Sequence, residues 1–176
     1  MEINILSFIK IFAENHLQCL LIGGQALAAY GYARQTIDID IMVDDADQGI
    51  LVKLLMHIGF KISAQSENSL RFAHAEIPIL EIDALLLDRG TFRLLYEAGT
   101  PMLAEYEQMR VPAPLHFIAL KLHAIKNNPS RELKDISDVL EVVRRMKSEI
   151  DLEELRKICD QYGPKGIFSK IAGHLN

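Results

Sequence analysis

The chain has no tryptophan, only two cysteines, and 7% aromatic residues among its 176 positions. The two thiols, Cys19 and Cys159, are too few for a disulfide framework, and the sequence has no CxxC or Cys/His spacing typical of a zinc site. We therefore expect both cysteines to be reduced and structural, as is usual for thiols in a cytoplasm.

Long apolar runs are also missing. A membrane-spanning helix needs roughly 18 consecutive apolar residues, and the nearest candidate, residues 19–33, is interrupted by three glycines and a glutamine. The first residues, Met1 to Asn4, lack the positive charge that begins a signal peptide. We therefore expect a cytoplasmic protein that has no membrane partner.

Charge of one sign does not dominate the chain. The net charge of −5 argues against nonspecific coating of nucleic acid. A local basic groove remains open in the C-terminal third, which contains Arg131, Lys134, Arg144, Arg145 and Lys147. Hydrophobic residues make up 49% of the chain, which is enough for a substantial core in one domain, or in one domain with a small helical extension.

Hydrophobic periodicity predicts an α+β fold. Strands are expected at 19–22, 36–43, 60–63, 70–74, 77–87 and 109–111, and helices at 3–14, 24–30, 50–58, 91–97, 114–126, 131–147 and 151–161. Residues 1–90 would form a sheet domain with an N-terminal helix, and residues 91–176 a helical part packed on it as one compact unit.

Two carboxylates, Asp38 and Asp40, stand two residues apart in an otherwise apolar strand. Because a strand repeats every two residues, both acids share one face with Thr36 and Met42, while β-branched aliphatic residues occupy the other face. Such a pair alone is weak evidence, since it can simply line the wet face of an edge strand. Hard divalent cations such as Mg²⁺ do prefer oxygen ligands of this kind.

A second acidic strand, which carries Glu81 and Asp83, strengthens the interpretation. An acid within so apolar a strand costs several kcal/mol if it is desolvated without a partner, and a metal beside Asp38 and Asp40 would remove that cost. Three carboxylates can hold two Mg²⁺ ions about 3.5–4 Å apart, the arrangement used for in-line displacement at phosphorus. We assign Asp38, Asp40 and Asp83 to metal binding and catalysis. Glu81 is assigned to a cross-strand salt bridge, and a solvated strand end is the alternative for Asp83.

The paired glycines Gly23 and Gly24 lie between an apolar strand and a predicted helix. Without a Cβ their backbone amides can approach an anion closely, and the start of a helix favours phosphate. An ordinary tight connection is the alternative. Arg34 either reaches a phosphate or faces solvent. Together with the acids, the glycines predict a metal–nucleotide site.

These residues resemble a known group. Gly23-Gly24, Asp38-x-Asp40 and Asp83 on a later strand are similar to the nucleotidyltransferase superfamily related to DNA polymerase beta. The resemblance implies a mixed β-sheet flanked by helices, followed by a C-terminal helical segment. It also implies two Mg²⁺ ions and a nucleoside triphosphate held near Gly23, Gly24, Arg34 and Thr36. Gly24 departs from the pattern, because many members have a serine there whose hydroxyl could contact the triphosphate.

Within the superfamily the spacing resembles the AbiEii-type abortive-infection toxins most, over roughly residues 20–145. There one helix contributes a lysine, here Lys121, and the next a run matching Lys134, Asp135 and Asp138. Lys121 has apolar helical neighbours, so its ammonium must extend to water or find an anion, and a triphosphate suits it. The bland alternative for the second run is two surface ion pairs, Arg131–Asp135 and Lys134–Asp138.

The expected activity is Mg²⁺-dependent transfer of a nucleoside monophosphate from a triphosphate such as ATP to an acceptor hydroxyl. The resemblance implies a tRNA 3′ end as acceptor and the role of a toxin paired with an antitoxin, and a protein hydroxyl is a second acceptor. The alternative is a catalytically inactive nucleotide-binding or interaction module of the same fold.

Overall fold

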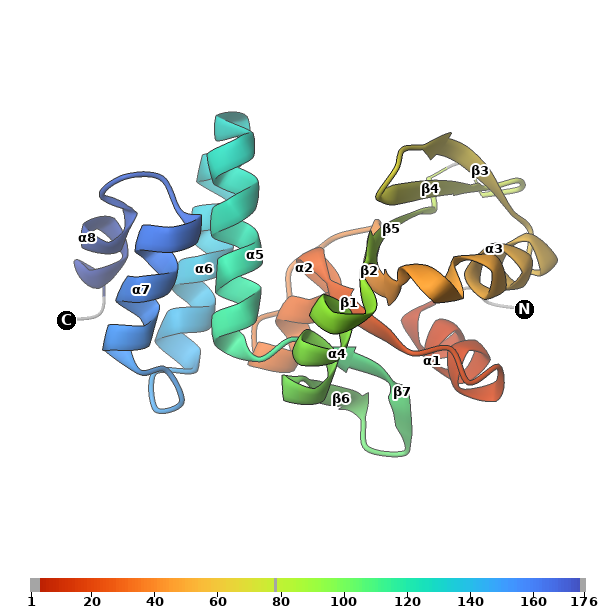
Figure 1. Cartoon of the computed structure of the whole chain (residues 1–176), viewed down its shortest axis with the longest axis horizontal. Helices are drawn as coiled ribbons and strands as arrows, with labels where there is room; N and C mark the ends of the chain where they lie inside the picture. Colours follow the sequence, from red (N-terminus) through yellow and green to blue (C-terminus); the bar gives the residue numbers. More distant parts are fainter. Residues whose placement is uncertain (1–3, 78, 175–176) are drawn as a thin grey trace. The chain divides into compact units, whose positions relative to one another are not determined.

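A computed structural model of the protein describes residues 4–77 and 79–174. The backbone divides into two units (Figure 1). The sheet unit comprises Met1–Ala29 and Ala33–Pro112, and the helical unit comprises Tyr30–Tyr32 and Ala113–Asn176. The division falls after residue 112, later than the boundary expected at residue 90. The reason is that the last two strands complete the sheet.

The sheet unit contains a seven-stranded mixed sheet in the order β3-β4-β5-β2-β1-β7-β6. Its strands are β1 (Cys19–Ile22), β2 (Ile39–Asp44), β3 (Phe60–Gln65), β4 (Ser69–His74), β5 (Glu81–Leu87), β6 (Thr100–Leu103) and β7 (Tyr106–Val111). The pairs β2/β5 and β1/β7 are parallel, and the others are antiparallel. The predicted α+β fold with a mixed sheet flanked by helices is confirmed.

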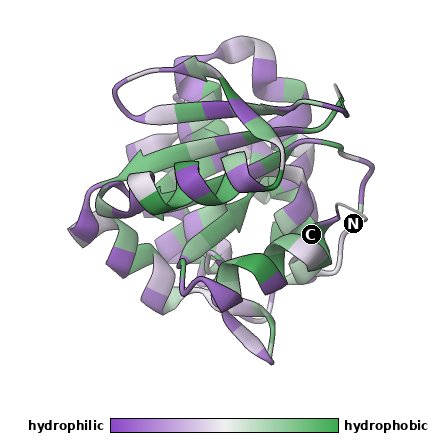
Figure 2. Ribbon diagram, turned by 90° about the vertical axis from the view of Figure 1, so that its right-hand side faces the viewer, coloured by the Kyte–Doolittle hydropathy of each residue, from purple (hydrophilic) through white to green (hydrophobic). Residues whose placement is uncertain are grey.

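Alternation along β5 separates the core from the site. In β5 the side chains of Ile82, Ala84 and Leu86 are buried, while those between them are at least partly exposed. Helices α1 (Ile5–Glu14), α3 (Gln48–His57) and α4 (Arg89–Ala98) supply further buried apolar side chains. Figure 2 shows hydrophobic residues running along the central strands, with hydrophilic residues on outward turns of the helices.

Two elements near the paired glycines are shorter than the sequence predicts. The acid-bearing strand begins at Ile39, so Thr36 and Asp38 precede it. Its neighbour β1 ends at Ile22, opposite Asp40, and offers no backbone partner beyond that point. The expected helix 24–30 consists of α2 (Gly23–Ala26) and a 3₁₀ turn (Leu27–Tyr30). So short a helix contributes little dipole.

The helical unit contains α5 (Pro114–Asn127), α6 (Glu132–Arg145), α7 (Leu152–Tyr162) and α8 (Ile167–Ala172), with a 3₁₀ turn (Pro129–Arg131) before α6. Figure 1 shows α5 beside both α6 and α7. Pro114 stands in the first turn of α5, where its missing N–H costs nothing. Helix α8 was not expected from the sequence. Among the described residues, no helix combines the length and the apolarity needed to span a membrane.

Both cysteines are buried free thiols, as expected. Burial, with a smaller contribution from the charge of Asp160, raises the pKa of Cys159 to about 11, and burial also raises the pKa of Cys19. The thiolate is the reactive form. Neither thiol should therefore react with an aromatic disulfide reagent in the native protein at pH 8, and both should react in denaturant. Rapid labelling of the native chain, followed by absorbance, would contradict this burial.

Candidate functional site

Three neighbouring strands bring charged side chains into one row. The parallel pairing of β2 and β5 puts Asp40 opposite Asp83, and the antiparallel pairing of β4 and β5 puts Arg71 opposite Asp83 on its other side. Side chains opposite in register lie on the same face of a sheet. Because Ile39 and Ile82 point into the core, this charged row lies on the other face. We call Asp40, Asp83 and Arg71 the charged row.

Arg71 binds Asp83 with both branches of its guanidinium. Its Nε donates to Oδ1 at 2.6 Å and its Nη2 to Oδ2 at 3.0 Å, with both side chains partly exposed. These hydrogen bonds and the charge of Asp83 raise the pKa of Arg71, and the charges of Glu81 and Asp38 add to the effect. The sequence interpretation missed Arg71. A signal for it was available in the sequence, because Arg71 is the only lysine or arginine in β4.

The prediction for Glu81 is wrong. The register places the uncharged Ala73 opposite Glu81, and it places Arg71 opposite Asp83. The cross-strand ion pair therefore forms at Asp83, and no ion pair involves Glu81 within residues 4–77 and 79–174. Arg71 consequently neutralises Asp83 and not Glu81.

The glycine turn contacts Asp40 directly. Gly23 has a φ of 65°, a left-handed conformation that favours glycine. A Cβ added to Gly23 would lie only 2.7 Å from Cγ of Asp40, and one added to Gly24 would lie 2.9 Å from Cγ2 of Thr36 and 3.1 Å from Cζ of Arg34. The predicted residues Gly23, Gly24, Arg34 and Thr36 are thus gathered beside Asp40. Thr36 and Arg34 fill the space that a serine side chain would need at position 24.

Carboxylate oxygens are the ligands that a divalent cation such as Mg²⁺ prefers, and Asp40 and Asp83 lie on neighbouring strands opposite one another. Asp38 is exposed and lies in the segment before β2, so it does not share the strand with Asp40 as predicted. Over the part of the chain that is described, no three Asp, Glu, His or Cys side chains are arranged to hold one metal ion. Both carboxylate oxygens of Asp83 accept hydrogen bonds from Arg71 instead.

The second motif forms a buried ionic cluster within the helical unit. Lys121 of α5 donates from Nζ to Oδ1 of Asp135 at 2.8 Å and to Oδ2 of Asp138 at 2.7 Å. Arg131 donates from Nε to Oδ2 of Asp135 at 2.8 Å. Lys121 is 6% exposed, Asp135 0% and Asp138 1%, so the charges depend on one another. We call these four residues the ionic cluster.

The anions that pair with Lys121 are the carboxylates of Asp135 and Asp138 in the same chain. Burial opposes the charged form of Asp135, but hydrogen bonds from Arg131 and Lys121 outweigh burial and hold the pKa of Asp135 below its usual value. The Arg131–Asp135 pair is confirmed. The Lys134–Asp138 surface pair is wrong, because Asp138 turns inward to Lys121, and exposed Lys134 makes no ion pair with any described residue.

The basic residues near the end of α6 are partly neutralised. Arg144 lies 2.7 Å and Arg145 3.1 Å from Oε2 of Glu141. Arg131 is likewise paired within the ionic cluster. These pairs weaken the case for the basic groove considered from the sequence.

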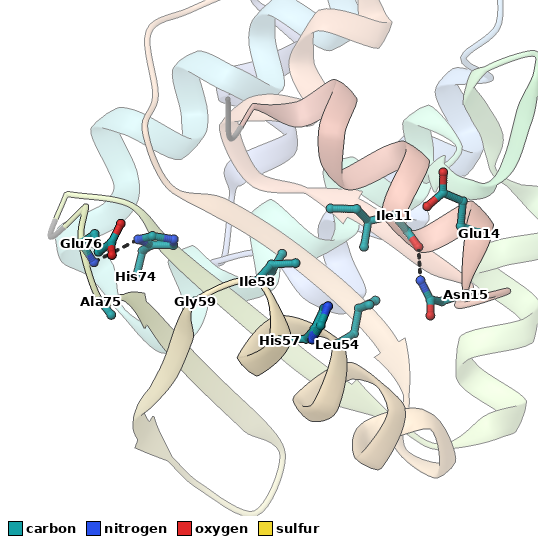
Figure 3. A pocket seen from close by; sticks show the side chains of 10 residues that line it. All are labelled: Ile11, Glu14, Asn15, Leu54, His57, Ile58, Gly59, His74, Ala75 and Glu76. Atoms are coloured by element: carbon teal, nitrogen blue, oxygen red, sulfur yellow. Dashed lines mark hydrogen bonds between the residues drawn. The ribbon is translucent and has the colours of Figure 1, made fainter. Parts of the chain in front are cut away.

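A hollow of about 670 Å³ lies between α1, α3 and the end of β4 (Figure 3). Its wall includes His74, whose Nδ1 accepts hydrogen bonds from the backbone N–H groups of Glu76 and Ile77, each at 3.1 Å. His74 is buried on the side of β4 opposite to Arg71. The hollow is therefore separate from the charged row, and His74 supports the loop after β4.

Gly23→Ala should displace Asp40 and destabilise the protein. The new methyl group meets the Asp40 carboxylate, and the left-handed backbone disfavours any Cβ, so we expect a loss of about 1–3 kcal/mol in urea unfolding. Gly49→Ala in α3 is the matched control, because no atom lies within 4 Å of a Cβ there. Equal stability of the two variants would contradict the contact between the turn and Asp40.

Lys121→Met should cost about 3–5 kcal/mol in the free energy of unfolding, because it removes the buried cation that Asp135 and Asp138 share. Lys134→Met, on the exposed face of α6, should change stability by less than about 0.5 kcal/mol. Denaturant unfolding followed by circular dichroism measures both. Similar values for the two variants would mean that the ionic cluster is not needed.

Comparison with known proteins identifies the family. The family model described as "Uncharacterised nucleotidyltransferase" matches residues 5–175. No curated protein matches the chain.

Solved structures share the fold. The solution structure of the antibiotic-resistance factor ANT(2'')-Ia superposes with a TM-score of 0.70 at 14% identity, covering 97% of this chain and 94% of the other. The lincosamide antibiotic adenylyltransferase LnuA, with lincomycin bound, gives a TM-score of 0.56 at 14% identity, covering 78% and 92%. At this identity the likeness shows the fold alone, while the narrower likeness to AbiEii-type toxins stays a prediction. The family match extends over nearly the whole chain, and the chain therefore belongs to this family of uncharacterised nucleotidyltransferases.

Proposed function

We propose that the protein transfers a nucleoside monophosphate from a nucleoside triphosphate to an acceptor hydroxyl. The observation that carries the proposal is the placement of Asp40, which lies opposite Asp83 in register and against the backbone of the Gly23 turn. A turn that can bind phosphate and two carboxylates on adjacent strands are parts that phosphoryl transfer uses, and we assign these roles to Gly23, Asp40 and Asp83.

The triphosphate would lie against the glycine turn. Backbone N–H groups of Gly23 and Gly24 would donate to its oxygens, and the Arg34 guanidinium, which packs on Gly24, would supply charge. Thr36, on the same side of the turn, would contribute its hydroxyl. These groups bind and orient the phosphates without taking part in bond making.

Within the helical unit, Lys121 and Lys134 are the residues that we propose for nucleotide binding. An ammonium has three N–H donors, and Lys121 uses two of them on Asp135 and Asp138, which leaves one for a phosphate. Lys134 is exposed and would bind a phosphate through its ammonium. Asp135 and Asp138 would then act by holding Lys121.

Asp38, Asp40 and Asp83 would hold Mg²⁺, which when bound stabilises the charge that develops on the transferred phosphoryl group. The acceptor oxygen attacks the α-phosphorus, the bond to the bridging oxygen breaks, and pyrophosphate leaves. Asp83, at the open side of the site, would take the proton of the acceptor hydroxyl.

A small hydroxyl compound fits the site best as acceptor. Asp38, Glu81 and Asp83 outnumber the cation Arg71 that pairs with Asp83, and this local excess of acid suits a cationic hydroxyl compound as acceptor. A protein of similar fold, ANT(2'')-Ia, is described in complex with adenylyl-2''-tobramycin at a TM-score of 0.66 and 14% identity, covering 98% of this chain and 97% of that one.

Two further candidates follow from specific features. The AbiEii-like spacing favours a tRNA 3′ end or a protein hydroxyl as acceptor, with an antitoxin as partner. The pairing of Asp83 with Arg71 and the absence of a hydroxyl at Gly24 favour an inactive nucleotide-binding module. The same experiment separates all of them.

The test is transfer of label from α-³²P nucleoside triphosphates, in Mg²⁺, to total tRNA, to a protein extract and to a panel of aminoglycosides and other polyhydroxyl compounds. Asp40→Ala should lower the rate by more than about a hundredfold, because even outer-shell partners of metal ligands cost about 10–100-fold. It should remain folded by circular dichroism.

Glu97→Ala, at an exposed position of α4, is the control and should keep the full rate. Retained activity in Asp40→Ala would refute the assignment of the site. Nucleotide binding by the wild type with no transfer to any acceptor would favour the inactive module.

A further inference from the structure

Arg71 occupies the position on Asp83 that a metal ion would need. Its guanidinium engages both carboxylate oxygens, and the pair lies directly beside Asp40 in the charged row. The same guanidinium also responds to the charges of Asp38 and Glu81. Arg71 therefore offsets part of the negative charge on this face.

A guanidinium and a divalent cation compete for such a carboxylate. Both are bound through the same oxygens, and placing Mg²⁺ close to a fixed positive charge is unfavourable. The competition can be reversible here, because the side chains of Arg71 and Asp83 are 51% and 38% exposed. An ion pair as exposed as this is weak and exchanges readily. Lys121 differs, since it and its partners Asp135 and Asp138 are buried from water.

We propose that Arg71 is the resident counter-cation of the site. It holds Asp83 while no metal is bound and releases it when a divalent cation binds between Asp40 and Asp83. This inference rests on the proposed role of Asp83 as a metal ligand. It adds that metal loading must displace an arginine, so that metal affinity is set partly by the Arg71–Asp83 pair.

Calorimetric titration of the whole chain with Mn²⁺ at low ionic strength tests the competition. Arg71→Met keeps the length of the side chain but removes the charge, and it should bind Mn²⁺ about two- to fivefold tighter, the equivalent of one exposed ion pair. Arg71→Lys keeps the charge and should stay closer to the wild type. With Asp83→Asn in the background, Arg71→Met should have no effect.

Arg89→Met is the matched control. Arg89 also binds a β2 carboxylate, with its Nε 3.1 Å from Oδ2 of Asp44, and its side chain is 64% exposed. Asp44 ends β2, four residues beyond Asp40. Removing this arginine should leave Mn²⁺ affinity unchanged, which separates competition at Asp83 from a general change in protein charge.

Direct observation of the arginine provides a second readout. In the metal-free protein the Nε–H signal of Arg71 should appear in a ¹H–¹⁵N spectrum as a hydrogen-bonded donor, assigned by its loss in Arg71→Lys. Saturating Mg²⁺ should move it toward the position of a solvated arginine and leave Arg89 in place.

Three results would overturn the inference. The first is Mn²⁺ binding by Arg71→Met that is equal to or weaker than that of the wild type. The second is no Mn²⁺ binding by any variant, and the third is an Nε–H signal of Arg71 that does not shift when Mg²⁺ is added. The titrations contain no nucleotide and no acceptor, so they decide the role of Arg71 whether or not transfer is found. Absence of transfer with tighter binding by Arg71→Met would refute the proposed function alone.

Discussion

The parallel pairing of β2 with β5 is the constraint on which the candidate site depends. It brings together two acids separated by more than forty positions in the chain and places Asp40 opposite Asp83. Backbone hydrogen bonds set this register, and the buried aliphatic residues on the core face keep it, because a shift by one residue would turn every side chain to the wrong face. The glycine turn after β1 and the arginine of β4 are then positioned by the strands on either side.

The two units handle charge in different ways. On the open face of the sheet Asp83 is partly exposed, and Arg71 offsets its charge through a weak pair that water and ions can reach. In the helical unit Lys121, Asp135 and Asp138 are buried, so removing one of them takes away a charge that its partners need. An exposed pair suits a site that must exchange ligands. A buried cluster suits a fixed connection between helices, here between α5 and α6.

Much of the site could be predicted from the sequence because its residues sit in strong local patterns. The paired glycines between a strand and a helix, and the acids in two otherwise aliphatic strands, pointed to Gly23, Gly24, Asp40 and Asp83, which the structure brings to one region of the sheet unit. Asp38 was placed on the strand by the same alternation, yet β2 begins after it, because β1 ends too early to pair with it. Periodicity alone does not reveal where a partner strand stops.

The sequence by itself determined the fold class, the burial of both cysteines and which strands carry acids, because these follow from composition and from the two-residue repeat of a strand. Only the tertiary structure decided which acid pairs with an arginine and which lysine pairs with acids. Arg71 meets Asp83 rather than Glu81 through the antiparallel register of β4 and β5, and Lys121 meets Asp135 and Asp138 through the packing of α5 on α6. Ion pairs between distant segments depend on register and packing angle, and neither quantity is encoded in any short stretch of the chain.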